Sequence, residues 1–200
     1  MSESRVIGRP RSESAREAIL AAAFAQLVAR GYDHLTIEGV ARLAGTGKTT
    51  VYRWWSSRAE LAVDAFFQAT EAELRFPDTG TAEGDFRTQI TELAELLRGE
   101  RGRALAGMLG GARSDPALAR ALGERWLTPR RQWGVERMAR AKASGELRDG
   151  VEIGAALAVL YGPLYTPLLF GGDVPQAAET VAYLDIACVG IFRAARGGRG

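Results

Sequence analysis

The sequence predicts an all-α protein in which an amino-terminal three-helix domain with a helix-turn-helix precedes a larger carboxy-terminal helical domain, about nine helices in all. Three observations support this fold class. Apolar residues recur at three- and four-residue steps along almost the whole chain, which is the spacing of one helix face. Capping residues and glycines divide the chain into helix-sized segments. No sustained alternation of apolar and polar residues indicates a strand.

The first helix is expected to run from about Ala15 to Arg30. Ser14-Ala15-Arg16-Glu17 has the pattern of a capping box, in which the Ser14 hydroxyl accepts from the Glu17 amide and the Glu17 carboxylate accepts from the Ser14 amide. At the other end, Gly31 can adopt the left-handed conformation that commonly terminates a helix.

Two short helices and a longer one are expected next. Thr36 can cap a helix that stops at Gly45, and Thr46 can cap another from Gly47 to about Trp55. Ser57-Arg58-Ala59-Glu60 is a second capping box and opens the fourth helix. Two short helices joined by a glycine-containing turn are typical of a helix-turn-helix.

The clearest break in the chain is Phe76-Pro77-Asp78-Thr79-Gly80-Thr81, because proline and glycine both oppose helix there. We therefore place the domain boundary at this break. The expected parts are a flexible basic arm over residues 1–13, a helix-turn-helix domain over residues 14–76, a second helical domain over residues 82–196, and a disordered tail over residues 197–200.

The remaining helices are marked by apolar spacing, by one Asp-Pro start and by an internal proline. Asp115 can cap a helix that has Pro116 at its first position, where the missing amide had no partner. Pro129 is expected to bend or restart this helix. The expected segments are about 86–97, 105–109, 116–145, 152–170 and 176–194.

Composition excludes several classes of protein. With 46% hydrophobic and 25% charged residues over 200 positions, the chain can bury a sizeable core without a metal or a disulfide. Its one cysteine, Cys188, cannot form an intramolecular bridge and is expected to be a buried, unreactive thiol. The longest apolar stretch, around Ala155–Phe170, is interrupted by Gly162, Pro163 and Pro167 and is shorter than the roughly 20 residues of a membrane span. With no secretory signal at its start, we expect a cytoplasmic protein that does not enter a membrane.

The functional signal lies in the segment Thr36–Trp55. Val51 and Trp55 are four residues apart, so they share one helix face, which is suited to packing inward. The opposite side then presents hydroxyl and cationic side chains. A helix that enters the major groove of DNA needs small residues at its tip, together with hydroxyls and cations that reach phosphates or base edges. This face supplies both.

This segment resembles the DNA-binding domain of the TetR family of bacterial repressors. The resemblance covers roughly Ala15–Phe67, and its motif reads Thr50-Val51-Tyr52, Trp54-Trp55, Ser57 and Arg58. It implies that Thr50, Tyr52 and Arg58 contact phosphate, and that Thr36 binds phosphate at a helix start. It also implies that Lys48, Thr49 and Arg53 face bases or flanking phosphates. Trp54 departs from the family pattern, which more usually has Tyr or His there, and is expected either to stack on sugar or to shield the helix. The expected DNA-binding residues are therefore Thr36, Lys48, Thr49, Thr50, Tyr52, Arg53, Trp54 and Arg58.

The resemblance also implies partners. A sequence-specific DNA-binding transcriptional regulator of this family is expected to bind a pseudo-palindromic double-stranded operator as a homodimer built on the last two helices. Residues 82–196 are then the ligand-binding and dimerisation domain, and repression released by a small-molecule ligand is the default. Glu124–Arg131 and Gly162-Pro163-Leu164-Tyr165 are similar to one carboxy-terminal subclass of the family.

The aromatic and sulfur-containing side chains of the second domain are candidates for an effector pocket, and ordinary core packing is the alternative for each. Pro163 and Pro167 remove helical hydrogen bonds and can open space beside the chain. This supply predicts a hydrophobic or aromatic effector. The candidate pocket residues are Leu105, Met108, Trp126, Trp133, Tyr161 and Tyr165.

No enzyme site, metal site or cofactor is expected. Gly45–Thr49 is not a Walker loop, because the pattern needs a glycine where Arg42 stands. His34 has no second histidine or cysteine at ligand spacing, and no nucleophile has an orienting partner. Two alternatives stay open: an effector-binding protein of the same fold that has lost operator recognition, and an all-helical enzyme that uses the carboxy-terminal cavity.

Overall fold

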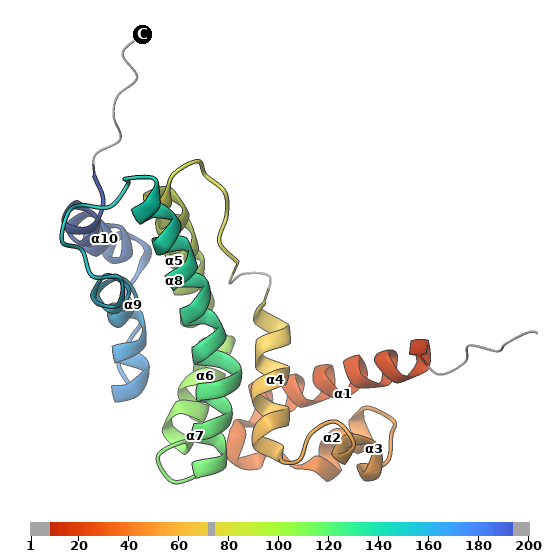
Figure 1. The fold of residues 1–200 in the computed structure, drawn as a ribbon. Coiled ribbons are helices and arrows are strands. Elements are labelled where there is room, and N and C mark those ends of the chain that lie inside the picture. Colours follow the sequence, from red (N-terminus) through yellow and green to blue (C-terminus); the bar gives the residue numbers. More distant parts are fainter. Residues whose placement is uncertain (1–8, 72–74, 194–200) are drawn as a thin grey trace, which may run out of the picture. The chain divides into compact units, whose positions relative to one another are not determined.

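The computed structural model describes residues 9–71 and 75–193, and every regular element within these ranges is helical (Figure 1). The all-α fold predicted from the sequence is confirmed. The amino-terminal helices are α1 (Arg9–Arg30), α2 (Ile37–Leu43), α3 (Lys48–Tyr52) and α4 (Arg58–Thr70). The others are α5 (Ala82–Arg98), α6 (Glu100–Gly111), α7 (Pro116–Leu122), α8 (Thr128–Ala143), α9 (Ile153–Phe170) and α10 (Ala177–Ile191).

The helices α7 and α8 follow one another without a loop. Gly123–Leu127 between them forms a π-helical turn, η3, and Pro129 lies in the first turn of α8. Proline is tolerated in a first helical turn, so the chain changes its winding where the sequence predicts a bend or a restart. This continuity reconciles the ten α-helices of the described residues with the nine or so that the sequence predicts.

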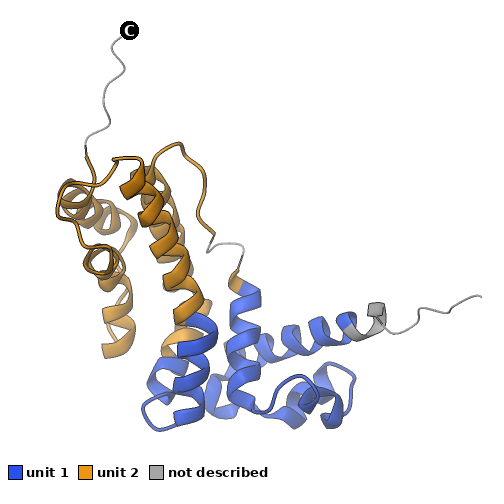
Figure 2. Cartoon of the chain, viewed as in Figure 1, with its two compact units in different colours: residues 1–69, 107–126 blue, residues 70–106, 127–200 orange. Residues whose placement is uncertain are grey.

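The chain forms two compact units, shown in different colours in Figure 2. Unit 1 comprises residues 1–69 and 107–126, and unit 2 comprises residues 70–106 and 127–200. The segment 107–126, which includes α7, thus groups with the amino-terminal helices, although it lies beyond the sequence break at residues 76–81.

In unit 1, α1 packs against α2 and α2 packs against α3. The buried residues of this unit include Ile19, Leu27 and Val40. The ring of Phe66, on α4, meets the buried ring of Trp126 edge-on at 4.8 Å between centroids. Aromatic pairs in this arrangement stabilise a core beyond the area they bury.

Several predicted helix ends are confirmed. The Thr36 hydroxyl accepts a hydrogen bond from the Gly39 amide at 3.1 Å and caps α2. Asp115 caps α7 by accepting from the amides of Ala117 and Leu118 at 3.0 and 3.1 Å. Gly31, which follows α1, has a φ of 75°, a value that L-residues with a side chain rarely adopt.

The predicted start of the first helix was wrong. The helix α1 begins at Arg9, not at Ala15, so Ser14 lies inside it and cannot act as its cap. Pro10 falls in the first turn, where a helix accepts proline, and no helix breaker follows until Gly31. Residues 1–8 of the predicted arm and residues 197–200 of the predicted tail lie outside the described residues.

The predicted cap of the third helix was also wrong. Gly47, not Thr46, precedes α3, and α3 ends at Tyr52. Thr46 is already engaged, because its amide donates to the Ala41 carbonyl at 2.9 Å across Gly45, whose φ is 65°. This is the bonding pattern that closes the carboxyl end of α2. Thr46 therefore belongs to the turn that closes α2, and the chain needs one more residue, Gly47, before α3 begins.

Half of the second capping box forms. The Ser57 hydroxyl accepts from the Glu60 amide at 3.2 Å, as predicted. The Glu60 carboxylate, however, accepts from the amide and the hydroxyl of Ser56, at 3.1 and 2.9 Å. The reciprocal bond therefore reaches one residue further back along the chain than the pattern predicts.

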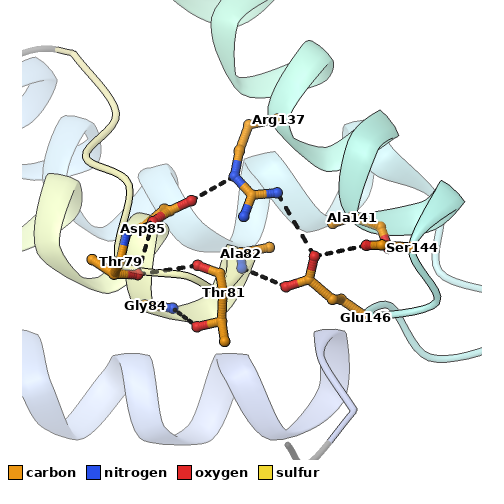
Figure 3. A network of polar contacts seen from close by, with 9 residues as sticks. All are labelled: Thr79, Thr81, Ala82, Gly84, Asp85, Arg137, Ala141, Ser144 and Glu146. Atoms are coloured by element: carbon orange, nitrogen blue, oxygen red, sulfur yellow. Dashed lines mark hydrogen bonds and ion pairs between the residues drawn. The ribbon is translucent and has the colours of Figure 1, made fainter.

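In unit 2, α5 packs against α8, α9 and α10. A polar cluster connects the beginning of α5 to α8 and to the segment that follows α8 (Figure 3). Asp85 accepts from the Thr79 amide at 2.7 Å, from the Thr79 hydroxyl at 2.8 Å and from Arg137 Nε at 2.6 Å. Arg137 also lies 3.9 Å from Glu146, whose carboxylate accepts from the Ala82 amide at 2.5 Å.

Asp85 is charged although it is buried. Burial raises the pKa of this carboxyl, but the hydrogen bonds from Thr79 and the ion pair with Arg137 outweigh burial and hold the pKa below its usual value. The cluster is thus a buried ion pair whose oxygen atoms are well supplied with donors.

Two sequence-based expectations concern single features of unit 2. Cys188 is buried as predicted, and burial raises the pKa of its thiol to about 11. The helix expected over about residues 152–170 is confirmed as α9, an 18-residue helix that contains Pro163 and Pro167. By length and composition α9 could cross a membrane. Its buried residues Leu160 and Leu164 lie in the interior of the protein.

Candidate nucleic-acid interface and candidate ligand cavity

The face of α3 that anchors it is the one predicted. Val51 and Trp55 are both buried. The Trp55 amide donates to the Val51 carbonyl at 3.1 Å, which keeps the two side chains on one face although α3 itself ends at Tyr52. Trp55 Nε1 donates to the Asp64 carboxylate on α4 at 2.9 Å. These contacts fix the orientation of the opposite side of α3.

That opposite side is open to solvent within unit 1. The Tyr52 side chain is 54% exposed, and Trp54 is exposed on the segment that follows α3. Lys48, Thr49 and Arg53 are also exposed, and Thr50 is half-buried. The residues predicted to contact DNA from this region therefore remain accessible.

Two cations of this region already have partners inside the chain. Lys48 Nζ lies 2.5 Å from the Glu38 carboxylate, and the hydrogen bond from Lys48 lowers the pKa of Glu38. The Arg53 guanidinium lies 5.9 Å from the centre of the Trp54 ring, within the range of a cation–π contact. An ion pair between exposed groups is weak, so a phosphate can replace Glu38 as the partner of Lys48 at little cost.

Arg58, at the start of α4, is held more firmly. Its guanidinium lies 4.5 Å from the centre of the Tyr32 ring and 3.9 Å from the Asp115 carboxylate. The Tyr32 hydroxyl donates to the same carboxylate at 2.8 Å, and burial together with this hydrogen bond raises the pKa of Tyr32 to about 12. Arg58 thus joins the turn before α2 to the cap of α7, and it remains partly exposed.

The Thr36 hydroxyl can donate a hydrogen bond to DNA while it caps α2. Its hydroxyl oxygen accepts from the Gly39 amide, and a hydroxyl that accepts in this way still has one proton to donate. Taken together, the region around α3 offers hydroxyl donors, guanidinium groups and an ammonium group from exposed positions. Such groups bind the phosphates and base edges of a nucleic acid.

Sequence reasoning missed one structural contact beneath this surface. Arg125, in η3, donates to the Asp64 carboxylate at 2.9 Å and lies 3.2 Å from the Glu60 carboxylate. Asp64 therefore accepts from both Trp55 and Arg125. Carboxylates at positions 60 and 64 share a face of α4, and this i, i+4 spacing was the available signal for a cation between them.

Unit 2 contains a cavity of about 370 Å³. Three of the six candidate pocket residues line it: Trp133, Tyr161 and Tyr165. The rest of the lining comes from Phe76, Gln89, Leu127, Arg130, Arg131, Gly134, Gly154, Leu157 and Ala158. The volume lies within the usual range of small-molecule sites.

The other three candidates, Leu105, Met108 and Trp126, are fully buried and do not belong to this lining. Trp126 contacts aromatic rings of α4 in unit 1. For these residues, the core packing that the sequence left as an alternative is what the structure shows.

The lining residues missed from the sequence follow a helical spacing. Leu127, Arg130, Arg131 and Gly134 recur at three- and four-residue steps up to and along α8. The residues of α9 follow the same rule from Gly154 to Tyr165. Facing stripes of this kind were visible in the sequence, but an apolar search passes over arginine and glycine. At Gly134 a side chain would meet Leu157 at 3.0 Å, which shows how closely α8 and α9 approach.

Two family models match the chain. The model described as "Bacterial regulatory proteins, tetR family" matches residues 19–65. The model described as "Tetracyclin repressor-like, C-terminal domain" matches residues 76–187, which is more than half of the chain. The two matches together span α2, α3 and the cavity.

Individual proteins give the same result. The uncharacterised HTH-type transcriptional regulator YdeS of Bacillus subtilis is 34% identical over 166 residues, covering 83% of this chain and 84% of that protein. The DNA-binding transcriptional repressor TetR of Mycobacteroides abscessus is 39% identical over 88 residues, covering 44% of this chain and 45% of that protein. The crystal structure of the TetR family transcription regulator SCO0332 matches with a TM-score of 0.78 and 32% identity, over 90% of this chain and 100% of that chain.

Proposed function

The chain belongs to the TetR family of bacterial regulatory proteins, and from this premise we propose that it represses transcription until a small molecule enters the cavity of unit 2. It is a DNA-binding transcriptional regulator. The observation that carries the proposal is the orientation of α3: Val51 and Trp55 hold it from within, and Tyr52 and Arg53 face outward. The site residues proposed for DNA are the eight predicted from the sequence.

The proposed operator is pseudo-palindromic and is bound by a two-fold dimer. In such a complex the two recognition helices enter successive major grooves, about 34–36 Å apart. A ligand that favours a dimer with another helix separation lowers DNA affinity, and DNA must then lower ligand affinity by the same factor. Members of this family act as dimers with small-molecule effectors, and we assign the effector to the unit 2 cavity because four aromatic residues line it.

The proposed dimer interface lies on α9 and α10. Large apolar side chains are exposed on both helices, and Phe170 is 83% exposed. A soluble monomer rarely exposes a large continuous apolar patch, so these side chains favour a partner of the same kind. One face of α9 is buried within the subunit, and in the proposed dimer a second face packs against the other subunit. Two buried faces would explain why α9 is apolar enough to resemble a membrane span. The exposed apolar residues of these helices are Val159, Leu169, Phe170, Val181, Ile186 and Val189.

The regulator is proposed to act in the cytoplasm, where its operator is. Regulators of this family are in general not enzymes, and no catalytic role is proposed for any residue. The experiment that tests the function is footprinting of the purified protein on the DNA upstream of its own gene, with and without a panel of small hydrophobic compounds. Protection of a pseudo-palindrome is expected, and its loss with one compound identifies the effector. Absence of any preference over competitor DNA would support the effector-binding alternative instead.

Replacing Arg53 by alanine is expected to lower operator affinity roughly ten-fold, because one phosphate or base contact is lost. The slope of log K against log salt concentration is expected to fall by about 1 per subunit.

Tyr52→Phe removes only a neutral donor, so operator affinity is expected to fall by about three- to ten-fold while the salt slope stays unchanged. Titrations by fluorescence anisotropy at several salt concentrations measure both quantities.

The matched control is Arg140→Ala, which removes an exposed arginine of α8 in unit 2. It is expected to leave both affinity and slope unchanged. Equal behaviour of Arg53→Ala and Arg140→Ala would remove Arg53 from the interface.

A further inference from the structure

The wall of the unit 2 cavity is rich in hydrogen-bond donors. Arg130 and Arg131 are consecutive in the first turn of α8, and both line the cavity. Arg130 donates to the Tyr165 hydroxyl, whose own proton then remains for another acceptor. The aromatic lining favours an apolar ligand body. The donors named here indicate that the polar end of the ligand accepts hydrogen bonds.

A further donor comes from α5. The Tyr161 hydroxyl donates to Gln89 Oε1 at 2.7 Å, so the amide nitrogen is the Gln89 group left to donate. Gln89 is buried and lines the cavity. A buried donor beside a cavity is stabilised when a ligand supplies an oxygen atom.

The charge of the wall is positive. Its lining residues include two arginines and no carboxylate. The carboxylate of Glu152 lies near Arg131 but caps α9, accepting from the Gly154 and Ala155 amides at 2.9 and 2.6 Å. These two hydrogen bonds are the main cause of the lowered pKa of Glu152, and Arg131 contributes less. Glu152 is thus chiefly occupied with the helix amides.

We propose that the ligand of this cavity is an organic acid: an apolar, largely aromatic body among Phe76, Trp133 and Leu157, with an anionic head group bound by Arg130 and Arg131. Arginine binds planar carboxylates through two parallel hydrogen bonds, which fixes the orientation of the ligand as well as its charge. The volume suits a ligand on the order of ten to twenty non-hydrogen atoms. The inference rests on the proposed function only in taking this cavity as the effector site.

Two fluorescent probes that share one skeleton and differ by a sulfonate group test the proposal. 8-Anilinonaphthalene-1-sulfonate is anionic, and N-phenyl-1-naphthylamine has the same skeleton without the sulfonate. The double variant Arg130→Gln/Arg131→Gln is expected to raise the Kd of the sulfonate by about ten-fold or more, because charge-assisted hydrogen bonds are lost. The Kd of the neutral probe is expected to stay unchanged.

Two variants control for charge and for location. Arg140→Gln/Lys142→Gln removes the same net charge from α8 outside the cavity and is expected to change neither Kd. Ala158→Phe narrows the cavity and is expected to weaken both probes. If circular dichroism shows that the double arginine variant is unfolded, Arg131→Gln alone serves, because Arg131 is exposed and its replacement is expected to leave the fold intact. It is then expected to produce part of the same selective loss.

The proposal is overturned if the double arginine variant raises the Kd of both probes equally or changes neither Kd. It is also overturned if Ala158→Phe leaves the Kd of the sulfonate unchanged. The outcome is separate from that of the footprinting. A protein that protects an operator but binds both probes without regard to charge keeps its proposed function and loses the anionic site. A protein with charge-selective binding but no operator preference keeps the site and loses the regulatory role.

Discussion

Replacing Arg137 by methionine is expected to destabilise the protein by about 3 kcal/mol, because the substitution leaves the buried Asp85 carboxylate without its cation. The side chains of Asp85 and Arg137 are only 3% and 12% exposed, so water cannot replace the lost partner well. Two hydrogen bonds from Thr79 remain, which places the expected loss at the lower end of the range for broken buried pairs. Urea unfolding at pH 7 and one fixed protein concentration measures the change.

The control for this prediction is Arg140→Met, a substitution of an exposed arginine on the same helix, which is expected to change stability by less than about 0.5 kcal/mol. The double variant Asp85→Asn/Arg137→Met removes both charges and is expected to recover part of the loss. A single variant as stable as Arg140→Met would show that the pair contributes nothing to the fold.

The same pair predicts how stability depends on pH. The pKa of Asp85 in the folded protein lies below its unfolded value of about 3.9, so the charged carboxylate stabilises the fold fully above that pH. The contribution is lost as the pH falls through the folded-state pKa. Acid unfolding of the wild type should therefore be steeper in this range than that of Asp85→Asn. Identical profiles of the two proteins would contradict the assignment.

The variant Ile186→Glu is expected to convert the dimer to a monomer and to lower operator affinity at least about a hundred-fold. Ile186 is 80% exposed on α10, within the proposed interface. A glutamate at this position would bury a charge without a partner against apolar side chains of the other subunit, and a two-fold interface would contain two such charges. Loss of the second half-site removes the avidity of a dimer, which commonly amounts to two orders of magnitude or more.

Light scattering measures the mass, and anisotropy titration measures the affinity. Leu43→Glu places the same charge on a leucine of α2 that is 60% exposed, and its mass is expected to remain that of the dimer. If Ile186→Glu remains a dimer while the protein stays folded, the interface lies elsewhere.

Local signals were reliable at two helix starts. Thr36 and Asp115 cap their helices as predicted, because each stands directly before an apolar periodic run and its side-chain oxygen accepts from amides of the first turn. Asp115 does so although its carboxylate also accepts from the Tyr32 hydroxyl. The prediction for Thr46 failed because this residue still belongs to the turn that closes α2 after Gly45, so α3 begins one residue later than a Thr46 cap requires. Ser14 failed because helix interiors tolerate serine, so a capping pattern alone does not stop a helix from extending further.

The cavity shows a different limit. Trp133, Tyr161 and Tyr165 could be picked from the sequence by residue type, but type alone could not separate them from Trp126, which packs against rings of α4. Which aromatic residue lines a cavity depends on how far apart two helices lie. Gln89 was missed for the same reason, since it comes from a helix distant in the sequence, whereas Arg130 and Arg131 were missed because the search considered only apolar residues.

The burial of Cys188 has a practical consequence. Thiolate is the reactive form of cysteine, and a buried thiol with a raised pKa supplies very little of it at neutral pH. Because the sequence contains no other cysteine, one introduced at the exposed Thr49 should take up a spin label alone. Pulsed electron–electron double resonance would then measure the distance between the labels on the two α3 helices of the proposed dimer in solution, with and without effector.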